Sequence, residues 1–214
     1  HEKLENLPDA IKVYINLADW YSEKDEQEKA LEHLAHVKQI VPENFSSRER
    51  MAEIYFLTDR KEDAEQEYLE LGELAIEQDE FDTAEEFYRK LLEKYPDSVR
   101  AREALISLFE KLENQTALSR ECINLADLLE KTGDYERAAQ AVRRAKQANP
   151  KDINLHEKLI SILKESGEND AATEAYFELA DIHHEVGDED SIDVCFEEIR
   201  NLQPDKASVR ARIA

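Results

Sequence analysis

The run YINLADWY occupies residues 14–21, and three related runs follow it at a constant spacing. The same register holds YLELGELA at 68–75, CINLADLL at 122–129 and YFELADIH at 176–183. Four of the five prolines keep this step, at Pro42, Pro96, Pro150 and Pro204, and we call the shared spacing of 54 positions the repeat period. A fixed period of this kind is typical of a solenoid, in which one repeat cannot bury its apolar face without its neighbours.

The repeat period also predicts how the chain is organised. Residues 1–44 are expected to be the rear of one unit and residues 207–214 the start of another. Between them, complete units are expected at residues 45–98, 99–152 and 153–206. We therefore predict that residues 1–214 form a single helical-repeat domain that is a fragment of a longer solenoid.

The composition favours an ordered, helical chain. Hydrophobic residues make up 41% of the sequence, which is enough for a core, and only four of the 214 residues are glycine. Within the first complete unit, the apolar spacing predicts three helices, near 45–58, 61–78 and 80–94. Gly133 and Gly187 are expected at turns between helices, and Asp97 and Ser98 are expected to supply the cap of the following helix. The predicted fold class is all-α.

The order of these residues resembles the tetratricopeptide repeat. That family places Leu, a small residue and Tyr in one helix, then Ala, a large apolar residue and Pro in its partner. The pattern is matched by Tyr14, Leu17, Ala18, Tyr21, Ala30, Leu34 and Pro42. It is matched again by Tyr68, Leu71, Gly72, Ala84, Tyr88, Leu91 and Pro96, although Ala75 replaces the Tyr. The resemblance implies an α-solenoid of antiparallel helices with a tetratricopeptide-like superhelix. The unit departs from the family pattern, because one extra helix of about 20 residues precedes each 34-residue pair.

The middle helix of each unit has two apolar sides and one narrow polar stripe. Polar residues recur at every third or fourth position, which places them on one line of the helix. The middle helix is therefore predicted to be sandwiched between its neighbours, with the polar line free to bind a partner. We name these positions the middle-helix stripes. They are Asn16, Asp19 and Glu23; Glu70, Glu73 and Glu77; Asn124, Asp127 and Lys131; and Glu178, Asp181 and Glu185.

Successive units can present the stripes on one side or on alternating sides. If every helix runs antiparallel to the one before, three helices per unit make neighbouring units start in opposite directions. Equivalence then returns only after two repeat periods, and EKLEN at positions 2–6 does recur at 110–114. Duplication of a two-unit block explains the same recurrence. Both interpretations stay open at this point.

No pattern in the sequence predicts catalysis, a cofactor or a metal site. His183 and His184 lie near acidic residues, but adjacent helical side chains point about 100° apart. We expect one half-buried and one solvated histidine there. Cys122 and Cys195 occupy columns held elsewhere by packing residues, so both are expected to pack in the core.

A basic column lies near the start of each first helix. It comprises Arg48, Arg102 and Arg210, with His156 at the remaining position. Its expected use is in salt bridges with the chain's own carboxylates. The alternative is capture of an acidic tail, as in tetratricopeptide domains that clamp a carboxylate.

The charge balance limits the possible partners. The chain has 51 acidic and 28 basic residues, a net charge of −23, so binding to nucleic acid is not expected. No apolar run approaches the length of a transmembrane helix, so direct membrane insertion is not expected either. Two cysteines suit a cytoplasmic location, although His1 is not an initiator Met and a leader could have been removed.

The predicted function is a non-catalytic scaffold that presents an extended acidic surface to a protein or peptide partner with a basic surface. A first alternative is a structural element that self-associates by stacking through its end repeats. A second alternative is a regulatory repeat region of a larger enzyme.

Overall fold

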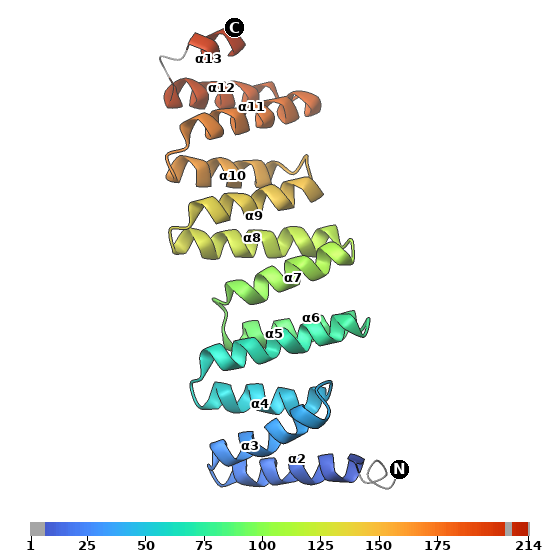
Figure 1. Ribbon diagram of the computed structural model, residues 1–214. Coiled ribbons are helices and arrows are strands. Elements are labelled where there is room, and N and C mark those ends of the chain that lie inside the picture. The colour runs from blue at the N-terminus through green and yellow to red at the C-terminus, as the bar shows by residue number, and fades with distance from the viewer. Residues whose placement is uncertain (1–6, 204–206, 214) are drawn as a thin grey trace. The chain divides into compact units, whose positions relative to one another are not determined.

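The computed structural model describes residues 7–203 and 207–213. Within these ranges all regular secondary structure is α-helical, which confirms the predicted fold class (Figure 1). The chain divides into two compact units, which we name the N-terminal unit (residues 1–104) and the C-terminal unit (residues 105–214). Among the described helices, none combines the length and the apolar character that a membrane-spanning segment needs.

Each unit is a series of short-linked helices. The N-terminal unit contains α2 (Leu7–Glu23), α3 (Gln27–Ile40), α4 (Phe45–Leu57), α5 (Lys61–Glu77), α6 (Phe81–Lys94) and the start of α7 (Val99–Lys111). The C-terminal unit contains the end of α7, then α8 (Gln115–Lys131), α9 (Tyr135–Ala148), α10 (Ile153–Glu165), α11 (Asn169–Val186), α12 (Glu189–Leu202) and α13 (Ala207–Ile213). Helices that follow one another in the chain pack side by side from α2 to α6 and from α8 to α13, as in an α-solenoid.

The helix boundaries themselves recur with the repeat period. Middle helices α2, α5, α8 and α11 begin at positions 7, 61, 115 and 169. The three helices expected for residues 45–98 agree with α4, α5 and α6 to within one residue at each end. Asn44, Ser98 and Asp152 also follow one another by one period, and each caps a first helix by accepting a hydrogen bond from a backbone N–H of the first turn.

Two left-handed positions mark the turns of the repeat. Gly133 and Gly187 have φ values of 78° and 75°, as the sequence predicts, and the equivalent positions hold Asp25 and Asp79 with φ values of 64° and 60°. The second left-handed position lies between the first and middle helices of each repeat, and it is held by Asp59, Glu113 and Gly167. A left-handed residue ends a helix and lets the next one fold back, and aspartate tolerates this conformation better than most side chains.

Small residues of the middle helices lie in the core. Ala18, Ala126 and Ala180 are buried, and Gly72 faces a neighbour more closely still. A methyl group at Gly72 would collide with the ring of Tyr88 on α6. This region therefore depends on the absence of a side chain at residue 72.

Helix α2 differs from the other middle helices in the exposure of one apolar side. Its Leu17 is 37% exposed, whereas the equivalent Leu71 of α5 is fully buried. Val13 and Trp20, on the same side of α2, are about half exposed. In α5 the corresponding side is covered by α4, whereas in α2 these side chains are exposed, and we call this the open side of α2.

Candidate protein-interaction surface

The middle-helix stripes lie at the surface of their helices. Four of the positions are half-buried, namely Asp19, Glu70, Asn124 and Asp127. The other eight are exposed, namely Asn16, Glu23, Glu73, Glu77, Lys131, Glu178, Asp181 and Glu185. The helical spacing explains this placement, since residues three and four apart share one face.

In the N-terminal unit, part of the stripe is engaged within the chain. Asp19 of α2 pairs with Arg50 of α4 through an Oδ1–Nε distance of 2.8 Å. Glu70 of α5 pairs with Lys38 of α3 at 3.2 Å and also accepts from Arg48 of α4. These carboxylates link their own helix to neighbouring helices.

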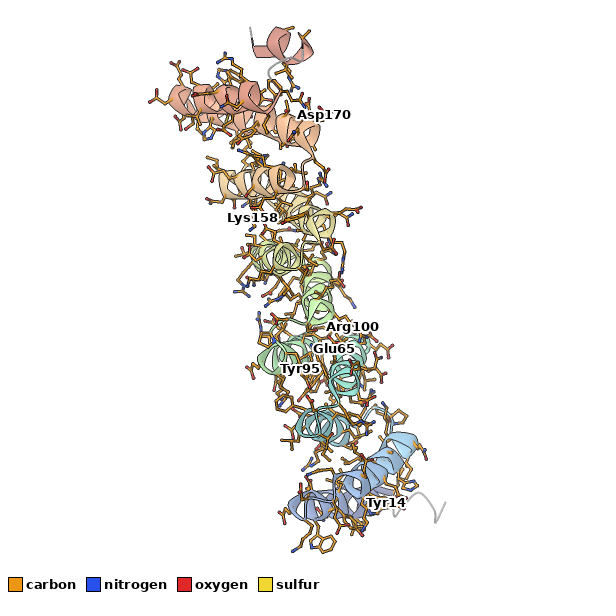
Figure 2. The ribbon with its side chains drawn as sticks, turned by 90° about the vertical axis from the view of Figure 1, so that its left-hand side faces the viewer. Tyr14, Glu65, Tyr95, Arg100, Lys158 and Asp170 are labelled. Atoms are coloured by element: carbon orange, nitrogen blue, oxygen red, sulfur yellow. The ribbon has the colours of Figure 1, made fainter. Side chains whose placement is uncertain are left out.

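The C-terminal unit uses its stripe in the same way. Lys158 of α10, labelled in Figure 2, lies 2.6 Å from Asp127 of α8. Lys146 of α9 lies 2.6 Å from Glu178 of α11. Lys151, just after α9, lies 2.5 Å from Glu185. The acids are therefore divided between internal and external use, which residue type alone does not reveal.

The internal pairs recur after two repeat periods. Asp127 and Lys158 stand two periods after Asp19 and Arg50. The pair of Glu178 and Lys146 stands in the same relation to Glu70 and Lys38. After a single period, the basic positions hold Leu92 and Ala104, which cannot form these pairs. The ion pairs thus follow a two-unit repeat.

A buried charged pair lies beneath the Glu70 position. Arg48 and Glu67 are both more than nine-tenths buried, and the Arg48 Nε lies 2.5 Å from the Glu67 carboxylate. Lys38 lies 2.7 Å from the same carboxylate. The expected salt-bridge use of the basic column is confirmed at Arg48. Sequence reasoning missed Glu67, because it lies beside the polar stripe in a position that holds Val13 in α2.

The basic column has a second shared contact. Each described member reaches the carbonyl oxygen of the proline six residues earlier, at 3.5 Å from Arg48, 3.2 Å from Arg102 and 2.9 Å from His156. The contact ties the first helix to the preceding turn. The side chain of Arg210 lies outside the part of the chain that the structure describes.

Local surroundings shift the pKa values of Glu70 and His156. Burial by itself raises the pKa of Glu70, but a hydrogen bond from Gln66 and the charges of Lys38 and Arg48 outweigh it and lower the pKa overall. The pKa of His156 is lowered because burial disfavours the imidazolium, against the opposing effect of the Pro150 carbonyl. At neutral pH Glu70 is therefore ionised in the N-terminal unit and His156 is neutral in the C-terminal unit.

Further charged pairs join helices two apart. Glu49 of α4 pairs with Lys90 of α6 at 2.5 Å, and Lys164 of α10 pairs with Glu198 of α12 at 2.7 Å. Glu65 and Arg100 lie close together on α5 and α7, 3.6 Å apart (Figure 2). Much of the basic content of the chain is therefore bound to its own acids.

Some acids of the middle-helix stripes form no ion pair with another described helix. Among the described residues, no ion pair involves four of the stripe acids, which are Glu23, Glu73, Glu77 and Asp181. All four are exposed. We name them the unpaired stripe acids. They are the stripe carboxylates whose charge remains available to an external group.

Three of the four residues considered for chemistry lie in the core. His183 is buried and His184 is exposed, while Cys122 and Cys195 are both buried. Burial raises the pKa of both thiols, that of Cys122 to about 11, so neither is a ready nucleophile. In the described part of the chain, no group of three or more metal-ligating side chains is placed to hold an ion.

Comparison with known families returns one kind of match. Tetratricopeptide-repeat models match residues 65–108 and residues 122–152. The first range covers most of α5, all of α6 and most of α7, and the second covers the end of α8 and all of α9. No curated protein matches the chain.

Several solved structures are similar to the chain at low identity. A tetratricopeptide repeat protein from Parabacteroides merdae has 15% identity and a TM-score of 0.28, over 96% of this chain and 98% of that one. The TPR2AB domain of yeast Sti1, in complex with pHSP90, has 10% identity and a TM-score of 0.35, over 91% and 99%. A STAND signal-transduction ATPase with a tetratricopeptide repeat sensor, from Pyrococcus horikoshii, has 15% identity and a TM-score of 0.40, over 93% and 35%.

Proposed function

Because the chain is a tetratricopeptide-like repeat protein, we propose that it is a non-catalytic scaffold that holds a protein or peptide partner on its acidic surface. Repeated helices offer an extended surface, which suits a long partner better than a small molecule. The observation that carries the proposal is the presence of the unpaired stripe acids beside stripe acids that are neutralised internally.

The negative charge of the surface indicates the charge of the partner. With a net charge of −23, the surface attracts basic groups and repels acidic ones. Glu73 and Glu77 lie on one turn of α5, where a Lys or Arg side chain can bridge both. We therefore infer that the partner presents basic residues, and that nucleic acid is not a partner.

The experiment compares two charge-matched variants. The first reverses three unpaired stripe acids, as Glu73→Lys, Glu77→Lys and Asp181→Lys. The second reverses three exposed acids on last helices of the repeat, as Glu32→Lys, Glu93→Lys and Asp193→Lys. Both change the net charge by the same amount, so they differ only in the position of the reversal.

Pull-down with mass spectrometry then identifies proteins that the wild type and the control variant retain but the stripe variant loses. For such a partner we expect about tenfold weaker binding to the stripe variant, because three attractions become repulsions. Equal capture by both variants, with both folded by circular dichroism, would show that the stripes are merely solvated.

A second candidate function is self-association, which the open side of α2 favours. Val13, Leu17 and Trp20 form an exposed apolar line at helical spacing, and apolar patches of this kind are common at interfaces. Such an interface would be head-to-tail and would depend on concentration. Molecular mass in solution across a dilution series distinguishes this candidate from a monomeric scaffold.

A further inference from the structure

A groove opens in the C-terminal unit between α10 and α12, with α11 as its floor. Its volume is about 500 Å³. The apolar part of its lining comprises Ile160, Leu179, Val194 and Cys195. Val194 is 59% exposed at the rim, although it is a large apolar residue. The groove lies on a different side of α11 from the stripe residues Glu178 and Asp181, which line another hollow.

Comparison with the N-terminal unit explains why the groove is open. The position two repeat periods before Cys195 holds Phe87, which is buried and packs edge-on against Phe45 with ring centroids 5.5 Å apart. Cysteine replaces this aromatic ring with a much smaller side chain. The position two periods before Val194 holds Glu86, so the rim has also changed from charged to apolar. Both differences favour an apolar ligand in the C-terminal unit.

The lining also contains one buried histidine. His183 is 8% exposed and lines the groove. Its Nδ1 makes no hydrogen bond among the described residues, but it lies 3.5 Å from Asp188 Oδ2, which is its charged neighbour. The apolar residues of the lining and the charges at the rim are therefore what the groove offers a ligand.

The charge around the groove is negative. Lys164 is neutralised by Glu198 at 2.7 Å, and Tyr176 donates to the same carboxylate at 3.1 Å. Glu157 and Glu165 of α10 line the groove, are exposed and take part in no ion pair within the described ranges. The free charges at the rim are therefore carboxylates.

We propose that this groove binds a short peptide segment of a partner, in which an apolar side chain enters the groove and flanking Lys or Arg residues face Glu157 and Glu165. The proposal rests on the scaffold function, since it names a second contact for a basic partner. It differs from the stripe contact in its location and in its need for an apolar anchor. The volume suits one large aliphatic or aromatic side chain with part of its backbone.

Three synthetic peptides test the proposal: Lys-Lys-Leu-Lys-Lys, the same peptide with Ser in place of Leu, and Glu-Glu-Leu-Glu-Glu. Binding is followed by NMR chemical-shift changes of the backbone amides in the whole chain. We expect saturable shifts with the first peptide at residues 183 and 194–195. We expect about tenfold weaker binding without the leucine, which loses the buried apolar contact. The acidic peptide should not bind.

Two variants fill or alter the groove with residues that the chain itself uses at equivalent positions of the repeat. Cys195→Phe introduces the residue type of Phe87, and Val194→Gln introduces that of Gln140. Both should weaken binding of the leucine peptide by about tenfold. Val194→Gln changes an exposed side chain and leaves the fold intact, so it remains informative if the larger phenylalanine is not accommodated.

The stripe variant serves as the control, because its three substitutions lie outside the groove lining. Loss of peptide binding in the groove variants, with binding kept in the stripe variant, supports the proposal. Absence of saturable shifts at the groove, shifts only at residues outside it, or equal binding of the serine peptide overturns it. If the peptide binds in the groove while the stripe variant still captures every partner, the stripe assignment alone is overturned.

Discussion

Position 72 shows how one residue and its neighbour have changed together. Helix α5 has glycine there, whereas the equivalent positions of the other middle helices hold Ala18, Ala126 and Ala180. On the following helix, α6 has Tyr88 where the other last helices hold Leu34, Val142 and Phe196. The ring of Tyr88 occupies the space that a side chain at residue 72 would need. A glycine in a helix interior is unfavourable by itself, so packing accounts for it here.

Substitution of Gly72→Ala should therefore destabilise the protein, although alanine is the better helix former. We expect a loss of roughly 1–3 kcal/mol in the free energy of unfolding, measured with urea, because the added methyl group overpacks the contact with Tyr88. Adding Tyr88→Leu, the residue of α3 at this position, should recover part of the loss. Unchanged stability in Gly72→Ala would show that Tyr88 moves aside without cost.

The turns show the limit of sequence reasoning at this scale. Gly133 and Gly187 identify their turns directly, because glycine is the usual residue with positive φ. Asp25 and Asp79 adopt the same conformation, yet nothing in their residue type separates them from the many other acidic residues. The left-handed conformation costs about 1–2 kcal/mol for a non-glycine residue. This cost cannot be recognised from the residue type in a sequence rich in aspartate and glutamate.

At the scale of helices, the boundaries were predictable and the charged contacts between helices were not. Prolines and capping residues at Asn44, Ser98 and Asp152 mark where helices stop and start, so the predicted ranges agree with the structure. The stripes were placed on the helix surface by their spacing alone. Their partners lie on other helices, often two along the chain, and the register between such helices depends on packing that the sequence does not state.

The buried pair of Arg48 and Glu67 makes these contacts testable, because the C-terminal unit has different residues there. The positions two repeat periods later hold His156 and Ala175, and both are buried. Removing one member of a buried ion pair leaves an uncompensated charge, whereas replacing both members avoids it.

Arg48→Ala should cost about 3 kcal/mol in the free energy of unfolding, near the lower end for a broken buried pair, because Lys38 still contacts Glu67. The double variant Arg48→His with Glu67→Ala should cost less than the sum of Arg48→His and Glu67→Ala measured separately. Guanidinium denaturation of the four variants provides the comparison. Additive losses would mean that the two side chains stabilise the helices independently.

For the whole molecule, ion pairs stabilise the fold, whereas repulsion among the excess carboxylates destabilises it. Many basic residues are held in ion pairs, but 51 acids against 28 bases leave a large excess of negative charge. Exposed pairs contribute about 0–1 kcal/mol each and act over a few ångströms. Repulsion among the remaining carboxylates acts over longer distances and lowers the stability of the compact state.

Salt separates these two contributions, since it screens both but acts most on charges that lie far apart. The Debye length falls from about 30 Å at 0.01 M salt to about 8 Å at 0.15 M, so long-range repulsion is lost while close pairs largely remain. We expect the Tm to rise by about 3 °C or more between these concentrations of sodium chloride, roughly 1 kcal/mol for a chain of this length. A variant with Glu23→Gln, Glu73→Gln, Glu77→Gln and Asp181→Asn removes four unpaired charges, so its Tm should start higher and rise less. A Tm that falls as salt is added would show instead that the ion pairs between helices outweigh the repulsion, and the unpaired stripe acids would then have little influence on stability.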